Sequence, residues 1–341
     1  MDFFNKLKSD FILCAEGYLF ELERRGYLKA GAFVPEVVLD YPNAVTELHK
    51  EFLNCGSDII VAFTYYAHRD KLKTIGREHD LEAMNRNALK IAKEVAVKGN
   101  VLMAGNICNT WVYDHTNHDE TAPIVEAMYE EQVRWAKEKG ADLIIAETIS
   151  YLEEARIALK VIKSFNLPAV INFAPFTEKT IEGHSFEDAC KQLEEEGADV
   201  VGLNCGMGPK TMLPILKRIR EKVKCPVAAL PVPYNTTNEY PTFQKLKKKD
   251  GKNAFPIFLE PYLMTREECA EFAIEAKNLG INFIGLCCGG APHHIRSMAE
   301  ALGRKVIASK YSPDMSLHAA LGNDDVVKEH VKKFIRNDWK D

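Results

Sequence analysis

The sequence predicts a single α/β domain of the (β/α)8 or TIM barrel class. Eight short apolar runs, rich in β-branched residues, alternate with stretches of helical period. The runs are continuously apolar, which is typical of strands buried on both faces of a parallel sheet. No Pro-, Gly- or Ser-rich linker separates the eight units, so we expect them to close into one barrel.

The predicted strands share a short, apolar composition. They are expected at residues 11–15, 58–63, 101–106, 142–147, 169–173, 199–204, 227–230 and 282–286. Amphipathic stretches predict helices at residues 43–54, 80–97, 123–139, 153–164, 186–196, 266–279 and 292–302. Glycine, which adopts the left-handed C-cap conformation at low cost, precedes the next strand at Gly56, Gly140, Gly197 and Gly280. The alternative, a doubly wound sheet, needs a Gly-rich phosphate turn, and residues 15–18 after the first strand lack one.

The barrel is expected to span residues 1–304. Its seventh connection, residues 231–265, is the longest and is rich in Pro and Asn, which predicts an irregular loop over one end of the barrel. The remaining residues, 305–341, form a C-terminal extension that is too long to be a frayed end. Apolar positions of helical period at 326–335 predict that it packs on the barrel or on a second subunit.

Composition excludes several classes of protein. The chain has 341 residues, 27% of them charged, and a net charge of -5, so no basic excess indicates a nucleic-acid partner. No apolar run reaches the ~18 residues that would span a membrane, and no signal peptide is visible. Nine cysteines form no paired framework, which favours a reducing cytoplasm where thiols are available for metal binding or catalysis.

Three cysteines are expected at the carboxyl ends of barrel strands, where reactive groups gather. Cys205 follows the sixth strand, and Cys287 and Cys288 follow the eighth. Three thiolates with a fourth position open are a catalytic zinc arrangement, and ordinary buried cysteines are the alternative. The other cysteines are predicted to be structural: Cys14, Cys55, Cys108, Cys190, Cys225 and Cys269.

Two carboxylates and several aromatic residues are expected at the same end. Glu16 follows the first strand and Glu147 ends the fourth, where they can serve acid/base catalysis or hold a substrate ammonium group. A salt bridge with a neighbouring loop is the alternative for each. Aromatic residues near the first three strand ends can form a cage for a quaternary cation, or pack in the core. They are Phe33, Phe63, Tyr65, Tyr66, Trp111 and Tyr113.

The two cysteine motifs resemble a known family. Residues 202–205 (Gly-Leu-Asn-Cys) and 285–289 (Gly-Leu-Cys-Cys-Gly) resemble the zinc signature of the homocysteine S-methyltransferases. The resemblance is closest to the betaine–homocysteine enzymes and covers residues 11–302. Further matching segments lie at residues 20–31, 63–67, 145–147 and 259–261.

The resemblance implies a zinc enzyme that moves a methyl group from a small onium donor to homocysteine, giving methionine. With glycine betaine, the expected donor, the second product is dimethylglycine. Dimethylsulfoniopropionate or S-methylmethionine as donor, and a non-catalytic zinc- or thiol-binding barrel, are the alternatives. The resemblance also implies a homo-oligomer.

The resemblance assigns roles to individual residues. Zinc is held by Cys205, Cys287 and Cys288. Glu147 binds the homocysteine amino group together with Glu16, which stands one position after Ala15, where the betaine enzymes carry an Asp. Phe33 and Tyr66 occupy donor-binding positions of the family, and Trp111, from the loop after the third strand, is expected to complete the donor cage. Phe33 replaces a family Trp and Thr148 replaces a family Tyr, so the donor cage differs from that of the betaine enzymes.

Overall fold

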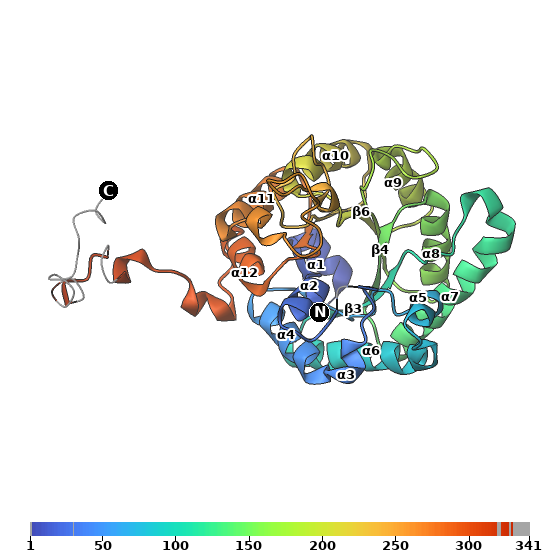
Figure 1. The fold of residues 1–341 in the computed structure, drawn as a ribbon, viewed down its shortest axis with the longest axis horizontal. Helices are drawn as coiled ribbons and strands as arrows, with labels where there is room; N and C mark the ends of the chain where they lie inside the picture. The colour runs from blue at the N-terminus through green and yellow to red at the C-terminus, as the bar shows by residue number, and fades with distance from the viewer. Residues whose placement is uncertain (1, 30, 319–321, 327–328, 330–341) are drawn as a thin grey trace. The chain divides into compact units, whose positions relative to one another are not determined.

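Eight parallel strands close into a barrel in chain order, as the sequence predicts. A computed structural model describes residues 2–29, 31–318, 322–326 and 329, and the barrel lies within them (Figure 1). The strands are β1 Ile12–Ala15, β2 Ile59–Val61, β3 Leu102–Cys108, β4 Leu143–Ile149, β5 Ala169–Phe173, β6 Val200–Asn204, β7 Val227–Leu230 and β8 Phe283–Leu286. Every strand residue is buried, because helices cover the outer face of the barrel and side chains fill its interior.

Helices surround the barrel (Figure 1). The longer ones are α4 Pro42–Asn54, α6 Leu81–Gly99, α7 His118–Glu138, α8 Leu152–Ser164, α9 Phe186–Glu195, α10 Pro209–Lys222, α11 Arg266–Asn278 and α12 Pro292–Ala301. The shorter ones are α1 Phe3–Ser9, α2 Tyr18–Arg24, α3 Val37–Asp40 and α5 Arg69–Thr74, with 3-10 turns η1 Glu78–Asp80, η2 His115–Asn117, η3 Phe243–Lys245 and η4 Glu260–Tyr262. The helix α7 begins five residues before the predicted start, because acidic residues in its first turn favour an N-terminus there.

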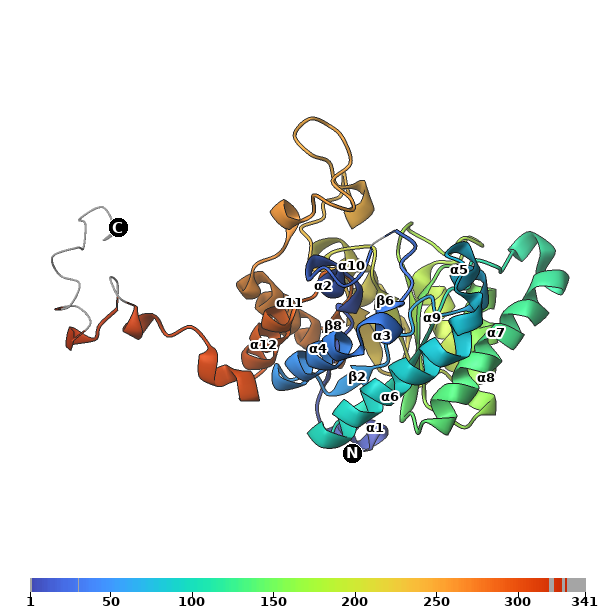
Figure 2. The same ribbon diagram turned by 60° about the horizontal axis from the view of Figure 1, so that its bottom comes forward.

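The connection after β7 is the long irregular loop that the sequence predicts. It contains η3 and η4, and an isolated bridge pairs Tyr234 with Leu263 across its base. Figure 2 shows part of this connection extending beyond the rest of the barrel. Such a loop can contribute side chains to a site at the carboxyl ends of the strands.

Two compact units, Met1–Val306 and Ile307–Asp341, make up the chain. The second contains the 3-10 turns η5 Ile307–Tyr311 and η6 Met315–Leu317 among its described residues. The helix predicted at 326–335 lies almost wholly outside the described residues, and the packing of the 305–341 extension stays a prediction. No helix in the described ranges is long and apolar enough to cross a membrane.

Gly202 in β6 allows close contact with the neighbouring strand. It pairs with Ala228 of β7, and a Cβ atom on Gly202 would lie 2.1 Å from the Ala228 carbonyl oxygen. Because both backbones are fixed by the barrel ladder, we expect Gly202→Ala to lower the free energy of unfolding by about 2 kcal/mol or more. Urea denaturation measures this, with Gly31→Ala as control because no atom lies within 4 Å of its added Cβ. Equal stability of the Gly202 variant and the wild type would contradict the packing argument.

Candidate active site

The three cysteines predicted to bind zinc lie together and are called the thiol cluster. The Sγ atoms of Cys205, Cys287 and Cys288 lie within 4.8 Å of one another, and those of Cys287 and Cys288 are 3.9 Å apart. Three sulfurs on one tetrahedral zinc, each with a Zn–S bond of ~2.3 Å, are separated by about 3.8 Å. The spacing therefore fits a single ion, with small adjustments of the side chains.

The end of β7 fixes the two arms of the thiol cluster relative to each other. The backbone N–H of Cys205 donates to the Leu230 carbonyl, and that of Cys287 donates to the carbonyl of the next residue, Pro231, both at 2.9 Å. Cys205 has a positive φ of 58°, which turns the chain sharply at the strand end. The strand between the two cysteine motifs thus holds the thiols at one height in the barrel mouth.

Hydrogen bonds within the thiol cluster are enough to stabilise one of its three cysteines as a thiolate. Hydrogen bonds from Cys287 and Cys288 lower the pKa of the Cys205 thiol to about 5. The same hydrogen bonds raise the pKa of Cys287 and Cys288 well above the usual value of a thiol. Three thiolates in this buried place therefore need a compensating cation, and a divalent soft metal suits the donor set.

The two predicted carboxylates lie beside the thiol cluster in an inner recess of about 30 Å³. Ligand atoms of Glu16, Glu147 and Cys287 lie within 4.8 Å of one another. Glu147 accepts hydrogen bonds from the side-chain amides of Asn106 at 2.5 Å and Asn204 at 2.7 Å. Among the described residues, Glu16 Oε2 has no hydrogen-bond partner although it is buried. The recess therefore offers acceptor atoms to a ligand that carries N–H groups.

Burial makes this pair of acids costly to ionise. Burial and the neighbouring Cys287 raise the pKa of Glu147 to about 8. Burial and the charge of Glu147 raise the pKa of Glu16 well above its usual range. A bound ammonium group offsets both effects, because it supplies positive charge and N–H donors to the two carboxylates.

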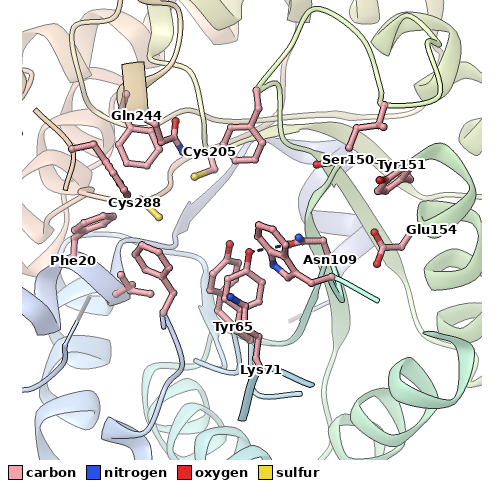
Figure 3. A pocket seen from close by; sticks show the side chains of 18 of the residues that line it. Phe20, Tyr65, Lys71, Asn109, Ser150, Tyr151, Glu154, Cys205, Gln244 and Cys288 are labelled. Carbon is pink, nitrogen blue, oxygen red and sulfur yellow. Dashed lines mark hydrogen bonds between the residues drawn. The ribbon is translucent and has the colours of Figure 1, made fainter. Parts of the chain in front are cut away.

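A second space, the aromatic cavity of about 600 Å³, opens next to the recess (Figure 3). Its aromatic lining residues are Phe20, Phe33, Tyr65, Tyr66, Trp111, Tyr113, Tyr151, Phe176, Phe243 and Phe255. Leu19, Tyr65, Cys205 and Cys288 line both the cavity and the recess. Two of the three thiols therefore lie where the two spaces meet.

The three residues predicted to bind the donor all line the aromatic cavity. Phe33, Tyr66 and Trp111 have positive φ values of 59°, 56° and 61°, and Thr148 at the end of β4 has 56°. Non-glycine residues in this conformation are uncommon and cluster at functional sites. Tyr66 is buried, and its hydroxyl lies 3.3 Å from the Asn109 side chain, whereas Trp111 is 66% exposed. Phe63, in contrast, lines the inner recess.

Several residues of the site were not predicted from the sequence. Phe243 and Phe255 come from the long loop after β7. The sequence of this loop predicts that it covers one end of the barrel, but not which of its side chains line the cavity. Asn106 and Asn204 lie inside β3 and β6, and strand composition alone does not reveal that both bind Glu147. Lys71 of α5 also lines the aromatic cavity.

A closed barrel that gathers thiols, paired acids and an aromatic wall at its strand ends is suited to group transfer at a thiol centre. The chain belongs to the homocysteine S-methyltransferase family, whose sequence model matches residues 17–302. It is therefore a methyltransferase, and its family supports homocysteine as the methyl acceptor.

Named relatives agree with this assignment. The chain is 34% identical over 331 residues to S-methylmethionine–homocysteine S-methyltransferase BHMT2 from Rattus norvegicus, covering 94% of this chain and 85% of the relative. It is 33% identical over 329 residues to betaine–homocysteine S-methyltransferase 1 from Xenopus tropicalis, covering 94% and 79%. The crystal structure of the metallated homocysteine methyltransferase MmuM from Escherichia coli shares the fold, with a TM-score of 0.67 and 17% identity over 86% of this chain and 96% of that one.

Proposed function

We propose that the protein transfers a methyl group from a small onium donor, glycine betaine in the first instance, to the sulfur of homocysteine. Zinc held by Cys205, Cys287 and Cys288 is part of this proposal. The observation that carries it is the position of the thiol cluster between an acidic recess and an aromatic cavity. One space suits an amino acid's ammonium group and the other suits an onium group.

The acceptor is positioned by the inner recess. Glu16 and Glu147 bind the ammonium group of homocysteine, and Asn106 and Asn204 hold the Glu147 carboxylate toward it. A zinc ion on the thiol cluster would lower the pKa of a homocysteine thiol, so that the acceptor is a thiolate at neutral pH. The buried surroundings exclude water from the sulfur, which keeps it nucleophilic.

The reaction needs no general base. A lone pair on the homocysteine sulfur forms the new S–C bond to the methyl carbon. The C–N bond of betaine breaks at the same time, and its electron pair stays on nitrogen. The products are methionine and dimethylglycine, whose tertiary amine leaves uncharged. The task of the protein is to align the two substrates and to favour the positive charge of the donor, which aromatic faces do.

The donor class is supported by the aromatic cavity. Phe33, Tyr66 and Trp111 bind the donor in this proposal, and the ring centroids of Tyr66 and Trp111 are 6.3 Å apart. Sulfonium donors such as S-methylmethionine and dimethylsulfoniopropionate carry the same charge on a sulfur with three substituents, one fewer than the nitrogen of betaine. They are the second candidates because Thr148 provides no aromatic ring at the end of β4 and because one named relative is called an S-methylmethionine enzyme. A cytoplasmic location and a homo-oligomer remain predictions.

Methionine formation tests the proposal. The zinc-loaded protein is incubated with homocysteine and, separately, with betaine, dimethylsulfoniopropionate and S-methylmethionine, and a chelated sample serves as control. Turnover with betaine that is lost on chelation is the expected result. Turnover with a sulfonium donor alone would replace betaine, and zinc binding without turnover from any donor would favour a non-catalytic barrel.

Removing the Tyr66 ring tests the donor site. We expect Tyr66→Ala to raise the KM for the donor about tenfold, which corresponds to the upper part of the cation–π range, and to change the homocysteine KM less. Steady-state kinetics with each substrate varied in turn measures this. Tyr41→Ala is the matched control, because Tyr41 is 52% exposed and does not line the cavity. A larger change in the homocysteine KM would remove Tyr66 from the donor site.

A further inference from the structure

Lys71 brings a positive charge to the wall of the aromatic cavity. Its Nζ atom lies 4.6 Å from the ring centroid of Tyr66 and 4.9 Å from that of Trp111. The ring of His68 accepts a hydrogen bond from the Lys71 backbone N–H and so caps the first turn of α5, the helix that carries Lys71. In Figure 3, Lys71 lies across the cavity from Cys205. The lysine is therefore held by two aromatic faces at a distance from the thiol cluster.

Among the described residues, the ammonium group of Lys71 forms no salt bridge with a carboxylate. Arg69 on the same helix, by contrast, pairs with Glu78 and Glu131. Glu154 also lines the cavity, and its Oε1 accepts hydrogen bonds from the backbone N–H and the hydroxyl of Thr110 at 2.8 and 2.7 Å and from the Tyr129 hydroxyl at 3.3 Å. Burial raises the pKa of the Glu154 carboxyl. The ammonium group of Lys71 is the cation that this lining offers to a carboxylate of a ligand.

The charges of the site are divided about the thiol cluster. The acids Glu16 and Glu147 line the inner recess, where they can hold the ammonium group of the acceptor, and Lys71 lines only the aromatic cavity. A ligand in the aromatic cavity that carried only positive charge would meet an ammonium group on the Tyr66 and Trp111 faces. A ligand with a carboxylate at one end would pair with Lys71.

We propose that Lys71 binds the carboxylate of the methyl donor. This inference rests on the proposed function, whose candidate donors all carry a carboxylate, and it assigns a partner to that group. With the carboxylate at Lys71, the onium group lies among the aromatic side chains of the same cavity, Tyr66 and Trp111 included. Elsewhere in this lining, the rings of Phe33, Phe255 and Phe243 follow one another at centroid distances of 6.4 and 5.3 Å. Lys71 is a specificity-determining residue that also orients the donor methyl group.

The proposal predicts opposite effects on two kinds of donor. Lys71→Met removes the charge and keeps an apolar side chain against the rings. We expect it to lower kcat/KM for betaine by about 10- to 100-fold, the loss that follows when one charge-assisted contact is removed. For tetramethylammonium, which has no carboxylate, kcat/KM should stay level or rise, because a like charge has been removed. Lys71→Arg, which keeps the charge, should restore most of the betaine activity.

A matched control lies on the same helix. Lys73→Met removes an exposed lysine two residues away that does not line the aromatic cavity, and it should change neither donor. The homocysteine KM should stay unchanged in all variants. Calorimetric titration of betaine and of tetramethylammonium into each full-length variant without homocysteine gives the affinity for each compound. The binding ratio, the affinity for betaine divided by that for tetramethylammonium, is thus obtained independently of turnover.

The outcomes separate this inference from the proposed function. Equal losses for both donors in Lys71→Met, or no loss for betaine, would overturn the role of Lys71 while methyl transfer by the wild type stands. A wild type that binds betaine but transfers no methyl group would refute the proposed function, and the binding ratio would still decide the inference. A wild type that binds neither donor would overturn both.

Discussion

Replacing Cys287 with alanine is expected to abolish zinc binding and methyl transfer together. The variant leaves only Cys205 and Cys288, which do not complete a site that needs three protein ligands. We expect zinc affinity and activity to fall by more than the ~10–100-fold that follows loss of an outer partner of a metal ligand. Elemental analysis of the purified protein and an assay of methionine formation measure the two effects.

A second cysteine variant controls for general damage. Cys225→Ala removes a half-buried thiol at the opposite end of the barrel, just before β7, and should keep both zinc and activity. Loss of zinc from Cys287→Ala with full methyl transfer preserved would contradict a zinc mechanism.

Neutralising Glu147 should selectively weaken the binding of homocysteine. Glu147→Gln keeps the shape of the side chain, but its amide nitrogen would face Asn106 or Asn204, which both donate to this position. The variant also loses the charge that binds the substrate ammonium. We expect the homocysteine KM to rise about 10- to 100-fold, as for loss of a hydrogen bond to a charged group, with the donor KM unchanged.

The control for this prediction is a carboxylate in α8, the helix that follows the strand of Glu147. Glu153→Gln alters a carboxylate of α8 that pairs with Arg156 and does not line either space. Its kinetics should match the wild type. An effect of Glu147→Gln on the donor KM alone would move Glu147 out of the acceptor site and would favour an electrostatic role toward the onium group.

The barrel could be predicted because its strands are buried on both faces. The bounds of β5 and β7 agree with the prediction to the residue, since Pro168 and Pro226 directly precede the two strands and Pro231 directly follows β7. The strands β3 and β4 each run two residues further, through Cys108 and Ile149. Their ends carry polar site residues, which interrupt the apolar pattern without ending the strand. The short helix α5 has six residues, which is too few for a helical period to be recognised.

The thiol cluster could be predicted because topology alone brings strand ends together. Cys205 and Cys287 are far apart in the chain, and closure of the barrel places their strands on either side of β7. Glu16 lines the inner recess, whereas Ala15, which the resemblance aligns with an acid of the betaine enzymes, lies fully buried in β1. Phe243, Phe255 and Lys71 were missed because loop and short-helix conformations leave no periodic signal.

The proposed acceptor site requires that the thiol cluster, loaded with zinc, receives the sulfur of homocysteine. Calorimetric titration of homocysteine into zinc-loaded and zinc-free protein, repeated in buffers of different ionisation enthalpy, tests this. Binding is expected to depend on zinc and to release a proton, since the thiol becomes a thiolate. Homoserine, which carries a hydroxyl in place of the thiol, should bind much more weakly. Equal binding of homocysteine with and without zinc, and without proton release, would rule out a zinc-bound acceptor sulfur.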